Sequence, residues 1–200
     1  MFAELTPRVL QLAQMAKTQG IGFTIDAEES ERLELTLELL AAVCRDPALA
    51  GWNGFGIAVQ TYQKRALPML KYIVGLARET NRILHVRLVK GAYWDAEIKR
   101  GQERGLPGYP LYTRKPNTDV SYLACARYVF DEGRGVLYPQ FATHNAHTVA
   151  AVASMASASK SVSRSWRRSA MPASTAPGSS NTRMARASKR GSPRKAARAG

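Results

Sequence analysis

The sequence predicts an α/β fold: about four central βα units of a (β/α)8 TIM barrel, followed by a disordered basic tail. Short apolar, β-prone runs alternate with amphipathic helical segments, and such repeated units bring the strands parallel, in a doubly wound sheet or a barrel. Each predicted strand also ends on polar residues that have no obvious packing role. This second observation favours the barrel, because barrel enzymes place their functional groups at the carboxyl ends of the strands.

The first elements are a helix over residues 7–17, ended by Gly20, and a short strand over residues 21–25 that ends on Asp26. A second helix is expected over residues 28–44. Its first turn is rich in Glu, which suits the positive end of the helix dipole.

A turn over residues 51–56 leads into the second strand, residues 57–59, which ends on Gln60. The third strand covers residues 83–89 and runs into a Lys-Gly-Ala-Tyr-Trp segment. The other elements follow the same alternation: a helix over residues 64–80, a helix over 95–104, a Gly- and Pro-rich loop over 105–110, a helix over 120–130, a fourth strand over 136–142 and a helix from residue 146.

Charge is distributed unevenly along the chain, whose formal net charge is +14. All 15 acidic residues precede residue 157, whereas residues 157–200 contain 11 of the 29 Lys and Arg residues. A basic total would ordinarily suggest nucleic acid or an anionic membrane as a partner. Here that reasoning applies only to the tail, so the barrel portion is not expected to bind nucleic acid.

The compartment is predicted from cysteine use and from segments that would direct export. Cys44 and Cys125 lie in apolar, helix-like surroundings without paired spacing, so we expect buried thiols in a reducing compartment. The first residues do not resemble a signal peptide, and no apolar stretch approaches the roughly 18 residues that a membrane span needs. We therefore expect a cytoplasmic protein, which could still contact the inner face of the membrane peripherally.

Three polar residues at or near the ends of the predicted strands have both a structural and a functional interpretation. Asp26 could cap the following helix, and Gln60 could be a loop amide. Arg87 lies inside the third strand. It would either point into the barrel, where a buried guanidinium needs acceptors such as a cofactor, or face water from an edge strand.

The segment after the third strand, Lys90-Gly91-Ala92-Tyr93-Trp94, offers a cation, two small residues and two flat rings. That composition suits a large planar ligand, although aromatic residues near a strand end more often serve packing. His144 and His147 have the spacing of metal ligands on a helix, but with no third ligand nearby we expect no metal. The sequence has no G-x-G-x-x-G or P-loop pattern, so an anionic aromatic cofactor would not be held in a Rossmann manner.

Five stretches of the chain resemble the proline dehydrogenase domain of the bacterial proline utilisation A family: IDAEESERLELTLELL, AGWNGFGIAVQTYQKRALP, RLVKGAYWDAEIKR, GYPLYTRKPNTDVSYLACA and YPQFATHNAHT. The resemblance is continuous from about residue 5 to residue 155, and RLVKGAYWD and FATHNAHT are highly specific. It implies a (β/α)8 barrel with FAD at the strand ends. It also implies oxidation of L-proline to Δ1-pyrroline-5-carboxylate, with a membrane quinone as electron acceptor.

The same resemblance implies roles for individual residues. Arg87 would sit beside the flavin N5 and tune its electronics, and Asp26 would belong to the hydrogen-bond network of the active site. Tyr93 and Ala92 would face the substrate. The residues implied to line the cofactor are Gln60, Arg87, Val89, Lys90, Gly91, Ala92 and Trp94, while Thr113, Thr143, His144 and Asn145 would contact its phosphate and ribose portions.

Residues 1–155 are thus expected to form the four middle βα units of the barrel, truncated at both ends, and residues 156–200 to form the tail. The tail has no acidic residue and little apolar periodicity, so it should be disordered, and we interpret it as a shifted reading frame. The alternative is a genuine arm, which would make the protein a nucleic-acid-binding one. Arg167 and Arg168 lack the pattern that surrounds the family's substrate-binding arginines, and we expect the chain to be inactive on proline by itself.

Overall fold

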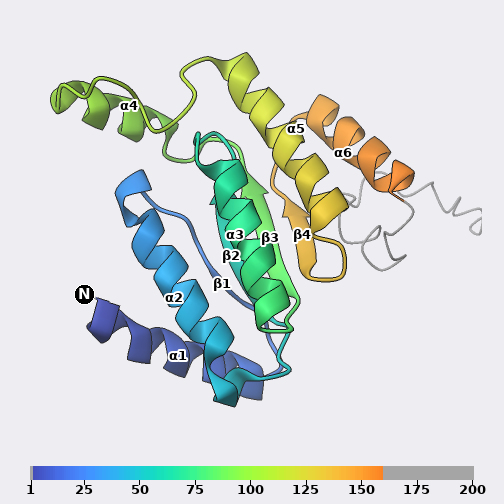
Figure 1. The fold of residues 1–200 in the computed structure, drawn as a ribbon. Helices are drawn as coiled ribbons and strands as arrows, with labels where there is room; N and C mark the ends of the chain where they lie inside the picture. Colours follow the sequence, from blue (N-terminus) through green and yellow to red (C-terminus); the bar gives the residue numbers. More distant parts are fainter. Residues whose placement is uncertain (1, 160–200) are drawn as a thin grey trace, which may run out of the picture.

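The structure, a computed structural model, describes residues 2–159 (Figure 1). These residues form one parallel sheet of four strands in the order β1 (Phe23–Ile25), β2 (Phe55–Gln60), β3 (Leu84–Val89) and β4 (Leu137–Phe141). Neighbours in the sheet are neighbours in the sequence, so the described strands wind in one direction. This is the order of a barrel, whereas a doubly wound sheet reverses direction at a switch point.

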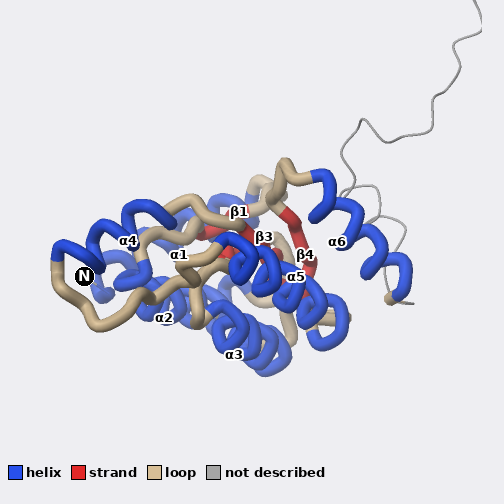
Figure 2. The backbone as a smooth tube through the Cα atoms, turned by 90° about the horizontal axis from the view of Figure 1, so that it is seen from above, coloured by secondary structure: helices blue, strands red, loops and turns tan. Residues whose placement is uncertain are grey.

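The helices follow the expected alternation. They are α1 (Phe2–Thr18), α2 (Leu33–Arg45), α3 (Ala66–Glu79), α4 (Trp94–Glu103), α5 (Lys115–Glu132) and α6 (Ala146–Ala158), with short 3₁₀ turns at Ser30–Arg32 and Pro47–Leu49. Figure 2 shows α2, α3 and α5 along one side of the strands. Figure 1 shows α4 near the end to which the strands point, while α1 crosses the opposite end. None of the described helices is long and apolar enough to cross a membrane.

The core lies between the sheet and these helices, and β3 shows which side chains face it. Leu84, Val86 and Leu88 are fully buried in the apolar cluster that includes residues of α2, α3, α5 and α6. His85, Arg87 and Val89 alternate with them and are only partly buried. Because side chains alternate across a strand, Arg87 points away from the helices, toward what would be the inside of a barrel.

The turn expected over residues 51–56 is wrong at its end, because β2 already begins at Phe55. Gly56 lies opposite His85 in the pairing of β2 with β3. A Cβ at residue 56 would lie 2.7 Å from both the Cβ and the carbonyl oxygen of His85. The glycine is therefore needed for a close approach between two strands.

Three helix starts also differ from expectation. The helix expected from residue 28 opens with the 3₁₀ turn Ser30–Arg32, and α1 begins at Phe2, so Pro7 lies inside the helix rather than at its start. Helix α5 begins at Lys115, well before residue 120. Its first turn contains Pro116, whose fixed φ suits a helix start, but its polar neighbours hid that turn from an apolar pattern.

Helix α6 ends at Ala158, beyond the boundary expected at residue 155. Residues 160–200 lie outside the described residues. The predictions of a disordered tail, a shifted reading frame and a nucleic-acid-binding arm fall there and stay predictions.

Candidate functional site

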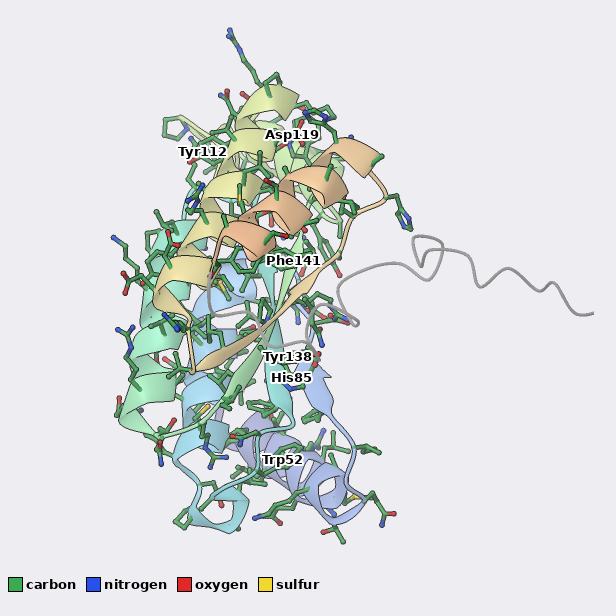
Figure 3. All side chains as sticks on the ribbon, turned by 90° about the vertical axis from the view of Figure 1, so that its right-hand side faces the viewer. Trp52, His85, Tyr112, Asp119, Tyr138 and Phe141 are labelled. Atoms are coloured by element: carbon green, nitrogen blue, oxygen red, sulfur yellow. The ribbon has the colours of Figure 1, made fainter. Side chains whose placement is uncertain are left out.

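A cleft of about 930 Å³ opens at the carboxyl ends of β3 and β4, within the size range of small-molecule sites. Its lining comes from the end of β3, the starts of α4 and α5, and the segment that joins β4 to α6: Lys90, Trp94, Thr113, Lys115, Thr118, Asp119, Phe141, Ala142, Thr143, His144 and Asn145. Figure 3 shows Asp119 beyond Phe141, with Tyr138 and His85 further down the sheet. This is the end of the sheet where barrel enzymes place their sites.

Lys90 is the most tightly held cation of the cleft. Its Nζ donates to Asp119 Oδ1 at 2.9 Å and to Thr148 Oγ1 at 2.8 Å, and it lies 5.0 Å from the ring centroid of Tyr122. These partners belong to α5 and α6, so Lys90 reaches toward the helix side of the sheet. Arg87 points to the other face of the same strand, so the two cations lie in different surroundings.

Asp119 bridges two lysines. Its Oδ2 accepts from Lys115 Nζ at 2.6 Å, while its Oδ1 accepts from Lys90. The hydrogen bonds from Lys115 and then Lys90 hold the pKa of the Asp119 carboxyl below its usual range. The carboxylate is therefore ionised at neutral pH.

Two helices begin at the cleft, α5 at Lys115 and α6 at Ala146. Asn145 caps α6, since its Oδ1 accepts from the Thr148 N–H at 3.0 Å, and the Asn145 N–H donates to Thr143 Oγ1 at 3.1 Å. Helix starts carry partial positive charge and attract anions. Lysines, hydroxyls and helix starts are donors that suit phosphate, and Trp94 and Phe141 add apolar ring surface. The lining thus fits an anionic nucleotide with an aromatic ring.

Arg87 and Asp26 form an ion pair on the inner face of the sheet, outside the lining of the cleft. Asp26 does not cap the following helix, because Glu29 occupies the N-cap of the 3₁₀ turn. The edge-strand interpretation of Arg87 is also wrong, because β3 lies between β2 and β4. His85 and Tyr138 lie further along this face with ring centroids 4.7 Å apart, and burial lowers the pKa of His85.

Gln60 is buried at the end of β2, and both ends of its amide have partners. Its Nε2 donates to the Glu28 carbonyl at 2.7 Å, and its Oε1 accepts from Gln63 Nε2. The loop-amide interpretation is wrong, because Gln60 is the last residue of β2. The Val89 carbonyl next to it accepts from the N–H of Thr61 at 3.1 Å and from its hydroxyl at 2.8 Å.

The aromatic pair at the start of α4 is anchored from two sides. The Tyr93 N–H donates to the Tyr62 hydroxyl at 3.1 Å, and Trp94 Nε1 donates to the Tyr112 carbonyl at 2.9 Å. Burial raises the pKa of Tyr62 to about 12, so its hydroxyl stays neutral and able to donate in turn. Of this segment, Trp94 lines the cleft, while Tyr93 and the exposed Gly91 and Ala92 lie outside its lining.

The structure thus brings six of the predicted site residues to one cleft: Lys90, Trp94, Thr113, Thr143, His144 and Asn145. It places the other predicted residues outside the lining: Asp26, Gln60, Arg87, Val89, Gly91, Ala92 and Tyr93. His144 and His147 are both exposed, and no group of three potential metal-ligating side chains occurs within residues 2–159.

Four residues around Lys90 were not predicted: Lys115, Asp119, Tyr122 and Thr148. The i,i+4 spacing of Lys115 and Asp119 is a sequence signal that could have found the first pair. Tyr122 and Thr148 meet Lys90 only through the packing of α5 and α6 beside β3, which the local sequence does not reveal.

A sequence model of the family described as proline dehydrogenase matches residues 2–169. The bifunctional protein PutA of Escherichia coli K12 is 56% identical over 153 residues, which are 76% of this chain and 12% of that protein. The Rhizobium meliloti protein of the same name is 55% identical over the same coverage. The chain thus spans about 12% of the length of these curated relatives.

Solved structures agree. A variant of Bradyrhizobium japonicum proline utilization A has a TM-score of 0.76 and 57% identity over 78% of this chain and 16% of that one. Proline utilization A from Bdellovibrio bacteriovorus, inactivated by N-propargylglycine, has a TM-score of 0.75 and 31% identity over the same coverage. The expected fold, part of a TIM barrel, is confirmed by this likeness.

Proposed function

The chain belongs to the proline dehydrogenase family, and on that premise we propose that it supplies the flavin-binding part of a site that oxidises L-proline to Δ1-pyrroline-5-carboxylate with FAD. The family is one of flavoenzymes. The observation that carries the proposal is the cleft at the strand ends, where Lys90, Lys115 and two helix starts gather positive charge beside Trp94 and Phe141. When bound, FAD would supply the acceptor for the hydride that leaves proline.

The anionic portion of FAD is assigned to this cleft. Lys90 is fixed by three partners and so offers a placed ammonium, while Thr113, Thr143, His144 and Asn145 line the cleft around it. Hydroxyls, an amide and an imidazole suit phosphate and ribose oxygens.

The ring portion is assigned to the strand ends on the inner face. Arg87 offers N–H donors there and forms an ion pair with Asp26, which is consistent with a role in tuning the flavin N5. Gln60 and Val89 form the adjoining ends of β2 and β3. A Cβ on Gly91 would meet only the Trp94 Cβ, at 3.9 Å. Since no described group crowds Gly91, close approach of the ring would account for a glycine there.

The substrate side is assigned to Ala92 and Tyr93, next to Arg87 at the end of β3. The Tyr62 hydroxyl fixes the Tyr93 backbone, and α4 is fixed in turn by Glu97, whose buried carboxylate accepts from the Ser30 N–H at 2.5 Å and hydroxyl at 2.8 Å. A substrate ring held against Tyr93 would thus meet a rigid surface, which is what orientation for hydride transfer requires.

Family membership supports the remaining assignments: a quinone as electron acceptor, and a cytoplasmic protein that contacts the membrane peripherally where that acceptor lies. We further propose that the 200-residue chain alone does not turn over proline. The described sheet is open at β1 and β4, and Asp26 on its inner face is 76% exposed, so proline would meet no opposing wall.

The test is reconstitution of the purified chain with FAD, followed by desalting. The chain should retain flavin and reduce no dye when proline is added. Lys90→Ala should lower retention, whereas Lys71→Ala, an exposed lysine of α3, should not. Arg87→Met should change the visible spectrum of retained flavin. If Lys90→Ala retains as much flavin as the parent chain, the placement of the anionic portion is refuted. Proline-dependent dye reduction by the chain would refute its inactivity.

A further inference from the structure

Two of the cations that line the cleft share one counter-charge. Lys90 and Lys115 each donate to a different oxygen of the Asp119 carboxylate, at 2.9 Å and 2.6 Å. Asp119 is the one acidic side chain among the described residues that line the cleft. The ammonium groups to which an incoming anion would be drawn are therefore already paired with a resident anion.

Lys90 does not depend on Asp119 for its position. Its ammonium also donates to Thr148 Oγ1 at 2.8 Å and lies 5.0 Å from the ring centroid of Tyr122, which is fully buried and so cannot move aside. The Lys115 side chain is 76% exposed and can rotate into the cleft. Both cations would remain at the cleft without Asp119, and the carboxylate mainly sets how strongly they act on other anions.

The backbone of Asp119 cannot withdraw from the cleft when another anion arrives. It lies in the second turn of α5, and that helix is anchored in the core by the buried residues Tyr122, Cys125 and Ala126. A ligand phosphate must take one or both ammonium groups from the carboxylate while that carboxylate stays nearby. Repulsion between the two anions then opposes binding.

We propose that Asp119 is an affinity-determining residue: it occupies the Lys90–Lys115 pair as a resident counter-anion, and phosphate-bearing ligands bind in competition with it. This inference rests on the proposed function, in that it takes the cleft to receive the anionic portion of a nucleotide. The inference adds that Asp119 keeps the affinity of the cleft for phosphate lower than Lys90 and Lys115 would give without it.

The proposal predicts that the affinity for pyrophosphate increases when the Asp119 side chain loses its charge. Asp119→Asn keeps the shape of the side chain and removes its negative charge, so pyrophosphate should bind about five- to tenfold more tightly at low salt. Asp119→Glu keeps the charge and should bind pyrophosphate like the parent chain. Asp131→Asn removes an equal charge from the far end of α5 and is the matched control.

The experiment uses the full 200-residue chain and inorganic pyrophosphate at low salt. Binding is measured as the rise in the urea midpoint that pyrophosphate causes, with each variant compared against itself without ligand. A ligand that binds the folded state raises this midpoint even when the free chain is only marginally stable.

A larger pyrophosphate-dependent rise in Asp119→Asn than in the parent, Asp119→Glu and Asp131→Asn supports the proposal. An equal or smaller rise in Asp119→Asn, beside a parent rise that Lys90→Ala abolishes, overturns it and leaves the proposed function standing. No rise in any of the variants, Asp119→Asn included, overturns both. A rise that appears only in Asp119→Asn supports the proposal in its strongest form, in which the carboxylate blocks the site.

Discussion

Arg82 makes an unusual set of contacts that allows a prediction about stability. It is 5% exposed, and its guanidinium donates to four backbone carbonyls: those of Cys44 at 2.7 Å, Asp46 at 3.2 Å, Leu49 at 2.6 Å and Trp52 at 3.3 Å. These carbonyls lie at the end of α2 and in the connection to β2. One side chain therefore satisfies backbone acceptors that the end of a helix would otherwise leave without partners.

Replacing Arg82 with Met keeps the aliphatic volume and removes every donor. A hydrogen bond from a charged group contributes about 1.5–3 kcal/mol, but four bonds from one guanidinium are not additive. Breaking a buried charged interaction costs about 3–5 kcal/mol, and we expect Arg82→Met to lower the free energy of unfolding by that amount. The free energy of unfolding of Arg82→Lys should lie between those of the parent chain and Arg82→Met, because one ammonium cannot reproduce the planar donor set.

The assay is urea denaturation followed by circular dichroism, with linear extrapolation to water. The matched control is Arg78→Met, whose side chain is 55% exposed and binds Glu132, and which should cost at most about 1 kcal/mol. Since Arg82 lies before β3, at the opposite end of the strand from the cleft, the response to pyrophosphate should not change. A cost for Arg82→Met no larger than that of Arg78→Met would refute the reasoning.

Three further predictions concern buried or paired polar groups. The Tyr122 hydroxyl is buried and has no hydrogen-bond partner among the described residues, so Tyr122→Phe should leave the urea midpoint unchanged or raise it; a clear fall would mean that the hydroxyl is bonded. Hydrogen bonds from Lys115 and Lys90 depress the pKa of Asp119, so the ionised carboxylate stabilises the fold above its ordinary pKa of about 4, and this contribution is lost as the pH falls. The urea midpoint of Asp119→Asn should therefore fall less than that of the parent between about pH 5 and about pH 3, and parallel curves would count against the pairing. Glu97→Ala removes the acceptor of the Ser30 N–H and hydroxyl, so amide hydrogen exchange should accelerate in α4, whereas Glu103→Ala, which removes an exposed carboxylate at the far end of α4, should leave it unchanged; equal exchange in both would show that Glu97 does not anchor the helix.

The alternation of strands and helices could be read from the sequence because each βα unit carries its own apolar period and its own Gly or Pro boundary. The segment after the third strand pointed to Lys90 and the family resemblance to Thr143–Asn145, which the structure brings to one cleft. Element ends were harder to predict. The first turn of α5 is polar and depends on Pro116, and β2 contains a glycine because His85 of β3 approaches closely there. Neither effect follows an apolar pattern.

The sequence could not show which cations share surroundings. Arg87 and Lys90 are three residues apart and both belong to the cofactor lining that the resemblance implies, yet they face opposite sides of β3. Their separation follows from strand alternation once the last strand residue is known. The pairing of Asp119 with Lys90 joins residues 29 positions apart and depends on how α5 packs beside β3. The role of such a residue can be proposed only from tertiary structure.

The central claim is that the cleft binds the anionic portion of a flavin nucleotide. The ratio of FAD affinity to riboflavin affinity tests this claim most directly. Both ligands carry the same ring, but riboflavin has no phosphate. Fluorescence titration of the 200-residue chain should give markedly tighter binding of FAD, and Lys90→Ala should bring the two affinities together. Equal affinities for FAD and riboflavin in the parent chain, or a preference for FAD that survives in Lys90→Ala, would contradict the account.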